Sequence, residues 1–103
     1  MGSWRNPTPQ IRLLDKCQVF GSIYLTSKAA DADFVVFEES EEAFANLVVY
    51  KETLLSYANE AGKWYFVEDP RLADYYVYIA PNIAQADFTI AFTDVESFAG
   101  CND

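Results

Sequence analysis

The chain has 103 residues, of which 51% are apolar and 17% aromatic, so it is long enough and apolar enough to fold around one small core. Its formal net charge of −9 argues against binding to nucleic acid or to an anionic membrane. The sequence holds no histidine, which removes imidazole bases, Ser-His and Cys-His nucleophile pairs and nearly all zinc sites. We therefore predict a domain that is not an enzyme and has no catalytic residues, metal or cofactor.

The first part of the chain, residues 1–16, carries Pro7 and Pro9 and no regular pattern. We expect it to form an extended arm or a cap, and residues 17–103 to form a single repeat domain. The sequence contains neither a run of about 18 apolar residues nor the apolar segment of a secretory signal. The protein is therefore expected to be soluble, either in the cytoplasm or as the mature form of an exported protein.

A repeat of 13 residues organises the rest of the chain. Ala followed by Asp or Asn recurs at Ala32, Ala45, Ala58, Ala73 and Ala86, and Ala99-Gly100 closes the series. Eight residues before the first five of these alanines stand the aromatic residues Tyr24, Phe37, Tyr50, Tyr65 and Tyr78. In the sixth unit Ala91 takes the place of the aromatic residue. An apolar column stands one position earlier in each unit and consists of Ile23, Val36, Val49, Trp64, Val77 and Ile90. One spacing is 15 residues, and the insertion Glu60-Ala61-Gly62 accounts for it with a glycine suited to a bulge.

Each unit begins with a short apolar run of β-branched and aromatic residues, which predicts a strand. The predicted strands are residues 34–37, 47–50, 64–67, 76–79 and 88–90. A helix N-cap type follows each run, and the candidates are Ser27, Ser40, Thr53, Asp69, Asn82 and Asp94. Only four or five residues then remain before the alanine, which is room for one helical turn. The small alanine is expected where this turn approaches the sheet closely.

The repeat predicts an α/β fold, a solenoid-like sheet of parallel strands built from about six units of one strand and one helical turn. The alternative is an antiparallel β-meander with helical-turn connections, because parallel crossovers usually take a dozen residues or more. In a linear solenoid Cys17 and Cys101 would lie about 25 to 30 Å apart, which forbids a disulfide between them. A closed or folded-back sheet would permit one.

Three groups of residues are candidates for a site. The aromatic column Tyr24, Phe37, Tyr50, Tyr65 and Tyr78 would form a binding stripe if it faced solvent, and part of the core otherwise. Asp33, Asp74 and Asp87 could line up as calcium ligands, but Asn46 and Asn59 replace carboxylates, and Asx residues before strands commonly bond backbone. Residues 38–42 hold four glutamates, which we interpret as a solvated charge run rather than a catalytic pair.

The same pattern, as in 63–67 followed by Ala73-Asp74, Tyr78 and Ala86-Asp87, resembles a bacterial family of short repeat proteins classified as a domain of unknown function. The resemblance covers residues 17–101. It implies a fold of strand-plus-turn repeats and no activity, cofactor or catalytic residue.

We expect a module that binds another protein, or a second copy of itself as a homodimer, through a sheet face or an exposed end strand. An acidic decoy that inhibits a basic cleft is the alternative that the net charge of −9 suggests. Carbohydrate binding through the tyrosine stripe is a third.

Overall fold

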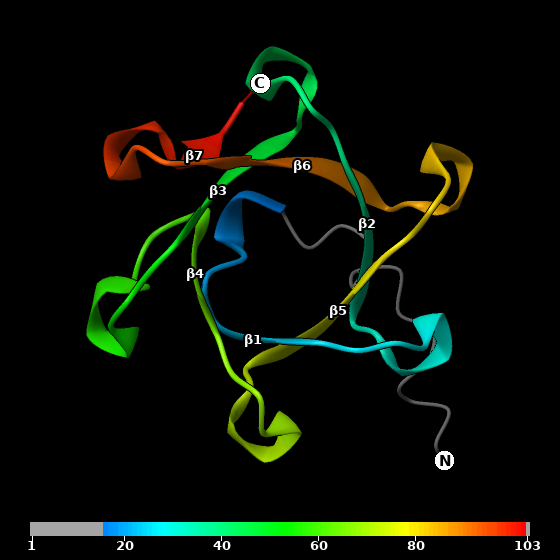
Figure 1. Ribbon diagram of the computed structural model, residues 1–103, viewed down its shortest axis with the longest axis horizontal. Coiled ribbons are helices and arrows are strands. Elements are labelled where there is room, and N and C mark those ends of the chain that lie inside the picture. Colours follow the sequence, from blue (N-terminus) through cyan, green and yellow to red (C-terminus); the bar gives the residue numbers. More distant parts are fainter. Residues whose placement is uncertain (1–15, 103) are drawn as a thin grey trace.

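The computed structural model describes residues 16–102, which form short strands joined by three-residue 3-10 helices (Figure 1). The strands are β1 (Gly21–Leu25), β2 (Phe34–Glu38), β3 (Leu47–Lys51), β4 (Lys63–Phe66), β5 (Tyr75–Ile79), β6 (Phe88–Thr93) and β7 (Gly100–Cys101). The 3-10 helices are η3 (Lys16–Gln18), η4 (Ala29–Asp31), η5 (Glu42–Phe44), η6 (Leu55–Tyr57), η7 (Pro70–Leu72), η8 (Ile83–Gln85) and η9 (Glu96–Phe98). Apart from Lys16, the expected N-terminal arm lies outside the described residues.

Strands β1 to β6 form a closed barrel in which all neighbours are parallel. Around the barrel the order is β1, β5, β2, β6, β3, β4, and β4 pairs again with β1. The short β7 adds to β3 in the antiparallel direction. The prediction of parallel strands is thus confirmed, and the antiparallel meander is wrong. The expected stacking of each unit on the next unit in sequence is also wrong, because only β3 and β4 are neighbours both in sequence and in the barrel.

The α/β class is wrong for residues 16–102, which contain no α-helix. Each connection closes with two bonds between residues three apart, such as Phe44 N–H to the Glu41 carbonyl and Ala45 N–H to the Glu42 carbonyl, because the alanine follows too soon for a longer helix. Two predicted caps are confirmed: Asp69 accepts from the Arg71 N–H and Asn82 from the Ala84 N–H. The other four helices begin one residue later than predicted, with N-cap residues Lys28, Glu41, Leu54 and Val95.

Neighbouring strands are offset by two residues at each of the six interfaces, which makes twelve residues around the barrel. The aromatic column shows this, because each member pairs with a residue two positions earlier in the neighbouring unit. The pairs are Tyr24 with Tyr76, Tyr78 with Val35, Phe37 with Thr89, Ala91 with Val48, Tyr50 with Lys63, and Tyr65 with Ser22. With about 3.3 Å per residue and about 4.8 Å between strands, the offset tilts the strands by about 54° from the barrel axis.

The steep tilt makes the chain travel around the axis more than along it. A five-residue strand of about 16 Å rises only about 10 Å along the axis, so a single 3-10 turn can return the chain for the next strand. The first circuit of the barrel contains β1, β2 and β3, and the second contains β4, β5 and β6, with each strand of one circuit between two of the other (Figure 1). The barrel strands therefore leave no free edge, and within residues 16–102 the expected exposed end strand is missing apart from the two-residue β7.

The interior of the barrel is filled by side chains in layers. The middle layer is the predicted apolar column, whose members are all 0% exposed: Ile23, Val36, Val49, Trp64, Val77 and Ile90. Phe34, Leu47 and Phe88 pack at the end where strands begin, and Phe66, Ile79 and Phe92 pack at the end where they finish. Val19 covers the first end and accepts a hydrogen bond of 2.9 Å from Trp64 Nε1. The core is therefore a packed interior and not a channel.

Gly62 is a buried glycine at the junction of the two circuits, between β3 and β4. Gly62, in the two-residue insertion, has φ +81°, and a Cβ there would meet the Val48 carbonyl and the Gly100 backbone. Its own N–H donates to Val19 and its carbonyl accepts from Tyr50 N–H at 2.8 Å. The insertion thus supplies the left-handed residue that lets β4 begin beside β3.

None of the helices in residues 16–102 is long or apolar enough to cross a membrane.

We predict that Gly62→Ala lowers the free energy of unfolding by about 3 kcal/mol, because the added methyl group meets fixed backbone. Gly100→Ala is the matched control: Gly100 also has positive φ, but a Cβ there meets nothing within 4 Å. This control should cost only about 1 kcal/mol. Chemical denaturation of both variants measures the difference, and equal losses would contradict the close approach at Gly62.

Candidate functional site

The aromatic column lies on the outer face of the barrel. Tyr24, Phe37, Tyr50, Tyr65 and Tyr78 are all half-buried, and they stand on five different strands around the circumference. Neighbouring strands bring Tyr24 against Tyr76, with ring centroids 5.3 Å apart and planes tilted by 59°. The stripe is therefore a belt divided among the strands, and no single flat ligand can contact all five rings.

Four of the five Asx residues of the repeat, all except Asn59, join neighbouring strands by hydrogen bonds to the backbone. Asp87 shows the arrangement: its N–H donates to the Val35 carbonyl, and its Oδ2 accepts from the Val35 N–H at 2.9 Å. We call this pair of hydrogen bonds to the N–H and carbonyl of one residue a bracket. Asp33 brackets Tyr76 in the same way, Asp74 brackets Ser22, and Asn46 brackets Thr89. The reading of these residues as a backbone ladder is confirmed. Among residues 16–102 no group of acidic or cysteine side chains is arranged to hold a metal ion.

The glutamate run lies at the surface where β2 leaves the barrel and η5 begins. Glu38 and Glu41 are exposed, and the Glu39 N–H donates to the Ile90 carbonyl. These positions agree with a solvated charge run.

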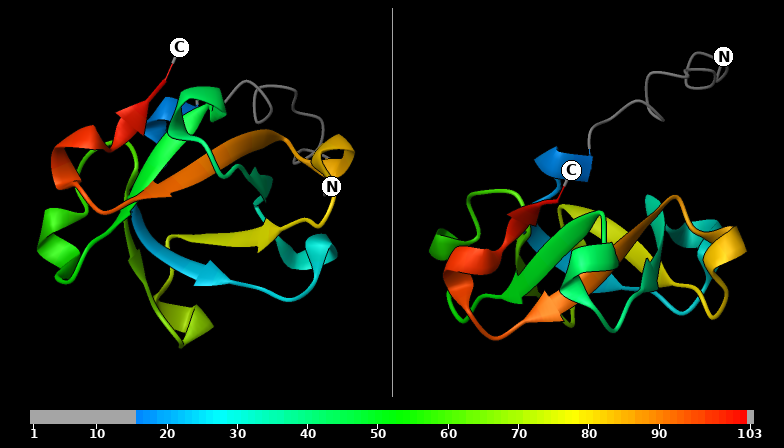
Figure 2. Two further views of the ribbon diagram at one scale, coloured as in Figure 1. Left: turned by 45° about the horizontal axis from the view of Figure 1, so that its top comes forward. Right: turned by 90° about the horizontal axis from the view of Figure 1, so that it is seen from above.

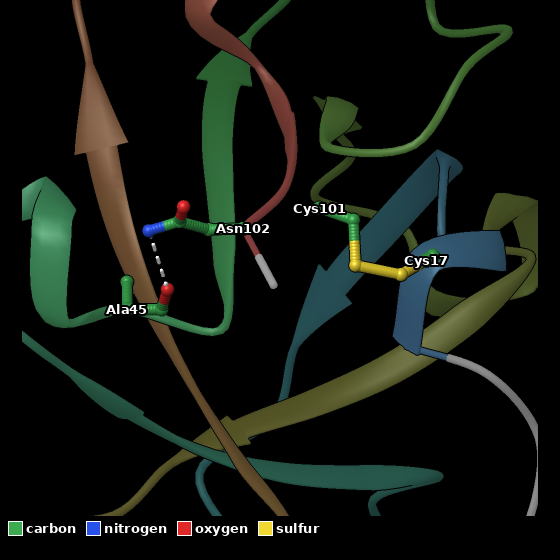
Figure 3. The surroundings of a disulfide bond; sticks show 4 residues. All are labelled: Cys17, Ala45, Cys101 and Asn102. Atoms are coloured by element: carbon green, nitrogen blue, oxygen red, sulfur yellow. Dashed lines mark hydrogen bonds between the residues drawn. A yellow bond between two sulfur atoms is a disulfide. The ribbon is translucent and has the colours of Figure 1, made fainter.

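Cys17 and Cys101 form a disulfide with Cα atoms 5.1 Å apart, which corrects the expectation drawn from a linear solenoid (Figure 3). The barrel closes, so the first and last units meet instead of lying at opposite ends of a stack. The next residue, Asn102, reinforces the closure: its N–H donates to the Asn46 carbonyl, and its side-chain amide donates to carbonyls of Glu42 and Ala45. Sequence reasoning did not single out Asn102, because it lies beyond the last repeat.

The tips of the turns carry exposed apolar side chains that sequence reasoning missed. They are densest on η6 and η9, which are successive turns around the rim of the barrel, at the left in Figure 1. The residues of this η6–η9 patch, with their exposed fractions, are Leu54 (52%), Leu55 (53%), Tyr57 (53%), Val95 (43%) and Phe98 (58%). A depression of about 280 Å³ lined by Tyr50, Lys51, Phe92, Thr93 and Asp94 adjoins the segments that lead into both turns. Of the predicted stripe, Tyr50 alone is part of this depression.

Two carboxyl groups at these turns share a hydrogen bond: that of Glu52, before η6, and that of Glu96, the first residue of η9. Glu52 is only 7% exposed, and its Oε2 has no hydrogen-bond partner among the described residues. Burial raises the pKa of Glu52 first, and the hydrogen bond to Glu96 and the charge of Glu96 raise it further, while Lys63 lowers it. Lys63 is itself paired with Glu60 at 3.2 Å, which helps to raise the pKa of Lys63. The pair therefore links the segment before η6 to η9 most strongly when Glu52 is protonated.

A comparison with known protein families matches residues 16–102 to the 7(1) septoil knot domain. The chain belongs to this family. The match includes all seven strands and both cysteines. It agrees with the expectation of a repeat-type domain family for residues 17–101, but it does not support the particular bacterial family that the pattern resembles. Comparisons with curated proteins and with solved structures gave no match. The description of this family names the topology of the chain and no activity.

We predict that Asp87→Ala lowers the free energy of unfolding by about 1 kcal/mol, because it leaves the Val35 N–H without its side-chain acceptor. Asp87→Asn keeps an acceptor oxygen and should stay within about 0.5 kcal/mol of the parent protein. Denaturant titration of the pair checks this, and an equal loss in both variants would show that the charge, not the hydrogen bond, matters.

We also predict that Glu52→Gln stabilises the protein at neutral pH. A raised pKa in the folded state means that the stability contributed by Glu52 is complete below its ordinary pKa of 4.5 and is lost as the pH rises through the raised value. The variant and the parent should therefore have similar melting temperatures near about pH 4, and the variant should melt higher near about pH 7. Thermal melts across this range measure the difference. Glu68→Gln, at an exposed glutamate, is the control and should show no such divergence.

Proposed function

We propose that this domain is a non-enzymatic module that binds another protein, and that the η6–η9 patch is its contact surface. The observation that carries the proposal is the gathering of five large apolar side chains, each 43 to 58% exposed, on two neighbouring turns. Apolar groups gathered in this way on a small soluble domain are typical of interaction sites.

The fold itself does not need these side chains. Neither η6 nor η9 contributes a buried residue, and the core is complete within the barrel. Polar residues could replace Leu55 and Phe98 without opening a cavity in the core. Because exposed apolar side chains are unfavourable in water, their presence suggests a role outside the core. Aromatic residues such as Tyr57 and Phe98 are also enriched in the centres of protein interfaces.

The charges indicate the chemistry of the partner. The domain carries a net charge of −9, and Asp94, Glu96 and Glu60 border the patch with Lys63 between them. The complementary surface is apolar at its centre and basic at its rim, which unites the interaction module with the acidic inhibitor considered from the sequence. Added salt should then weaken binding by screening the rim charges. A homodimer would need a different surface or high salt, because two acidic copies repel one another.

We predict that the double variant Leu55→Ser and Phe98→Ser weakens binding to the partner by about 2 kcal/mol, or roughly 30-fold. The control variant Leu72→Ser and Ile83→Ser removes equally exposed apolar side chains from η7 and η8, outside the patch, and should bind like the parent protein. The experiment captures proteins from the native source on the immobilised domain, purifies each one, and titrates it by calorimetry against the three forms.

Binding that is lost equally in both double variants, or in neither, would contradict the proposed surface. A ligand that proves to be a glycan, bound by the parent protein in an array, would instead favour the aromatic belt. Light scattering over a wide range of concentrations separates self-association from binding to a different protein.

A further inference from the structure

The two ends of the double winding meet at one place. Cys17 lies in η3 before the first barrel strand, and Cys101 lies in β7 after the last one. Their disulfide closes residues 17–101 into a covalent ring, with the cysteines 84 positions apart in sequence. Figure 2 shows η3 and the C-terminal strand together at the same end of the barrel.

The two circuits of this ring are interleaved throughout. Each barrel strand from the first circuit lies between two strands from the second, and the reverse also holds. The circuits therefore cannot be pulled apart side by side, because each is hydrogen bonded on both edges to the other.

The returns between strands pass outside the strands that they skip. The turn η4, which joins β1 to β2, packs on β5, and η5, which joins β2 to β3, packs on β6. In the second circuit η8 packs on β2 and η9 on β3. Because packed side chains fill the interior, every return must take the outer path. All barrel strands are parallel and wind in one direction, so these crossings have the same sense and do not cancel.

We propose that the Cys17–Cys101 disulfide makes this entanglement permanent, so that the oxidised chain remains a knotted ring even when it is unfolded. A ring that winds twice about one axis, with three or more crossings of one sense between its circuits, can be untied only by breaking a covalent bond, and four such returns are described above. The disulfide must consequently form after the chain has wound twice, when the barrel has brought the two cysteines together.

The bond can form by exchange with an oxidised small-molecule disulfide such as glutathione disulfide. The Cys17 thiolate attacks one sulfur of glutathione disulfide and releases one glutathione thiolate. The Cys101 thiolate then attacks the Cys17 sulfur of the mixed disulfide and releases the second. Two cysteine thiols are thereby oxidised, one glutathione disulfide is reduced, and the two protons pass to water or to the released thiolates.

The sequence offers a test that needs no substitution, because the chain has only two cysteines and therefore one possible intramolecular disulfide. One sample is oxidised in the folded state and then unfolded in guanidinium chloride. The other is reduced, unfolded in guanidinium chloride, and oxidised there at high dilution with glutathione disulfide. The two rings have the same mass and the same bond, and they differ only in whether the chain was wound when the bond formed.

In guanidinium chloride, size-exclusion chromatography should elute the ring closed in the folded state later, because a knotted ring is more compact. After removal of the denaturant, this ring should regain the native near-ultraviolet circular dichroism. The ring closed in the unfolded state should regain none of it until a reductant is added. Co-elution of the two rings in denaturant would overturn the proposal, and so would equal refolding without reductant.

Discussion

Each pair of neighbouring strands is offset by two residues, and at four of the six interfaces an Ala-Asx unit holds that offset by bracketing one residue of the adjacent strand. The bracket uses two hydrogen bonds to the same residue, so a slip by one position would break both and turn the apolar column outward. Repetition of the two-residue offset at all six interfaces produces the steep tilt. The tilt in turn makes a 3-10 turn long enough to connect parallel strands and lets the chain wind around the axis twice.

The interior and the outer surface of the barrel have different roles. The interior holds the residues on which stability depends, from the buried apolar column to the indole of Trp64 bonded to Val19. The turns lie outside and carry side chains that the core does not use. Because each of the turns η4 to η9 is closed by its own backbone hydrogen bonds, the residues at the tips can vary without disturbing the strands. This division allows one scaffold to present different contact surfaces.

Much of the repeat unit could be predicted from the sequence, because local hydrogen bonding and burial act within a few residues. Trp64 and Val77 are buried as their column predicts, Asp69 caps its helix, and Gly62 supplies the left-handed residue of the insertion. The order of strands could not be predicted, because a unit can make the same kind of bond to any parallel neighbour. The choice depends on the tilt, which arises only when all interfaces share one offset.

The same limit explains what was missed around the site. Glu52 and Glu96 lie 44 positions apart and meet only because η6 and η9 are neighbours on the closed rim. The constant phase of the repeat could have placed Leu54 and Val95 at the N-cap positions of their turns, since Asp69 and Asn82 occupy the same phase. The disulfide could not be predicted with certainty, because Cys17 and Cys101 meet only when the sheet closes.

The interleaving of the circuits has a consequence for molecules that recognise the patch. Tyr57 and Phe98 lie on successive turns of the rim, η6 and η9, but are 41 positions apart in sequence. No linear peptide cut from this chain can reproduce that surface, so it is a discontinuous epitope. An antibody specific for it would bind the folded domain and lose the denatured one, which makes such an antibody a reporter of the wound state in cells.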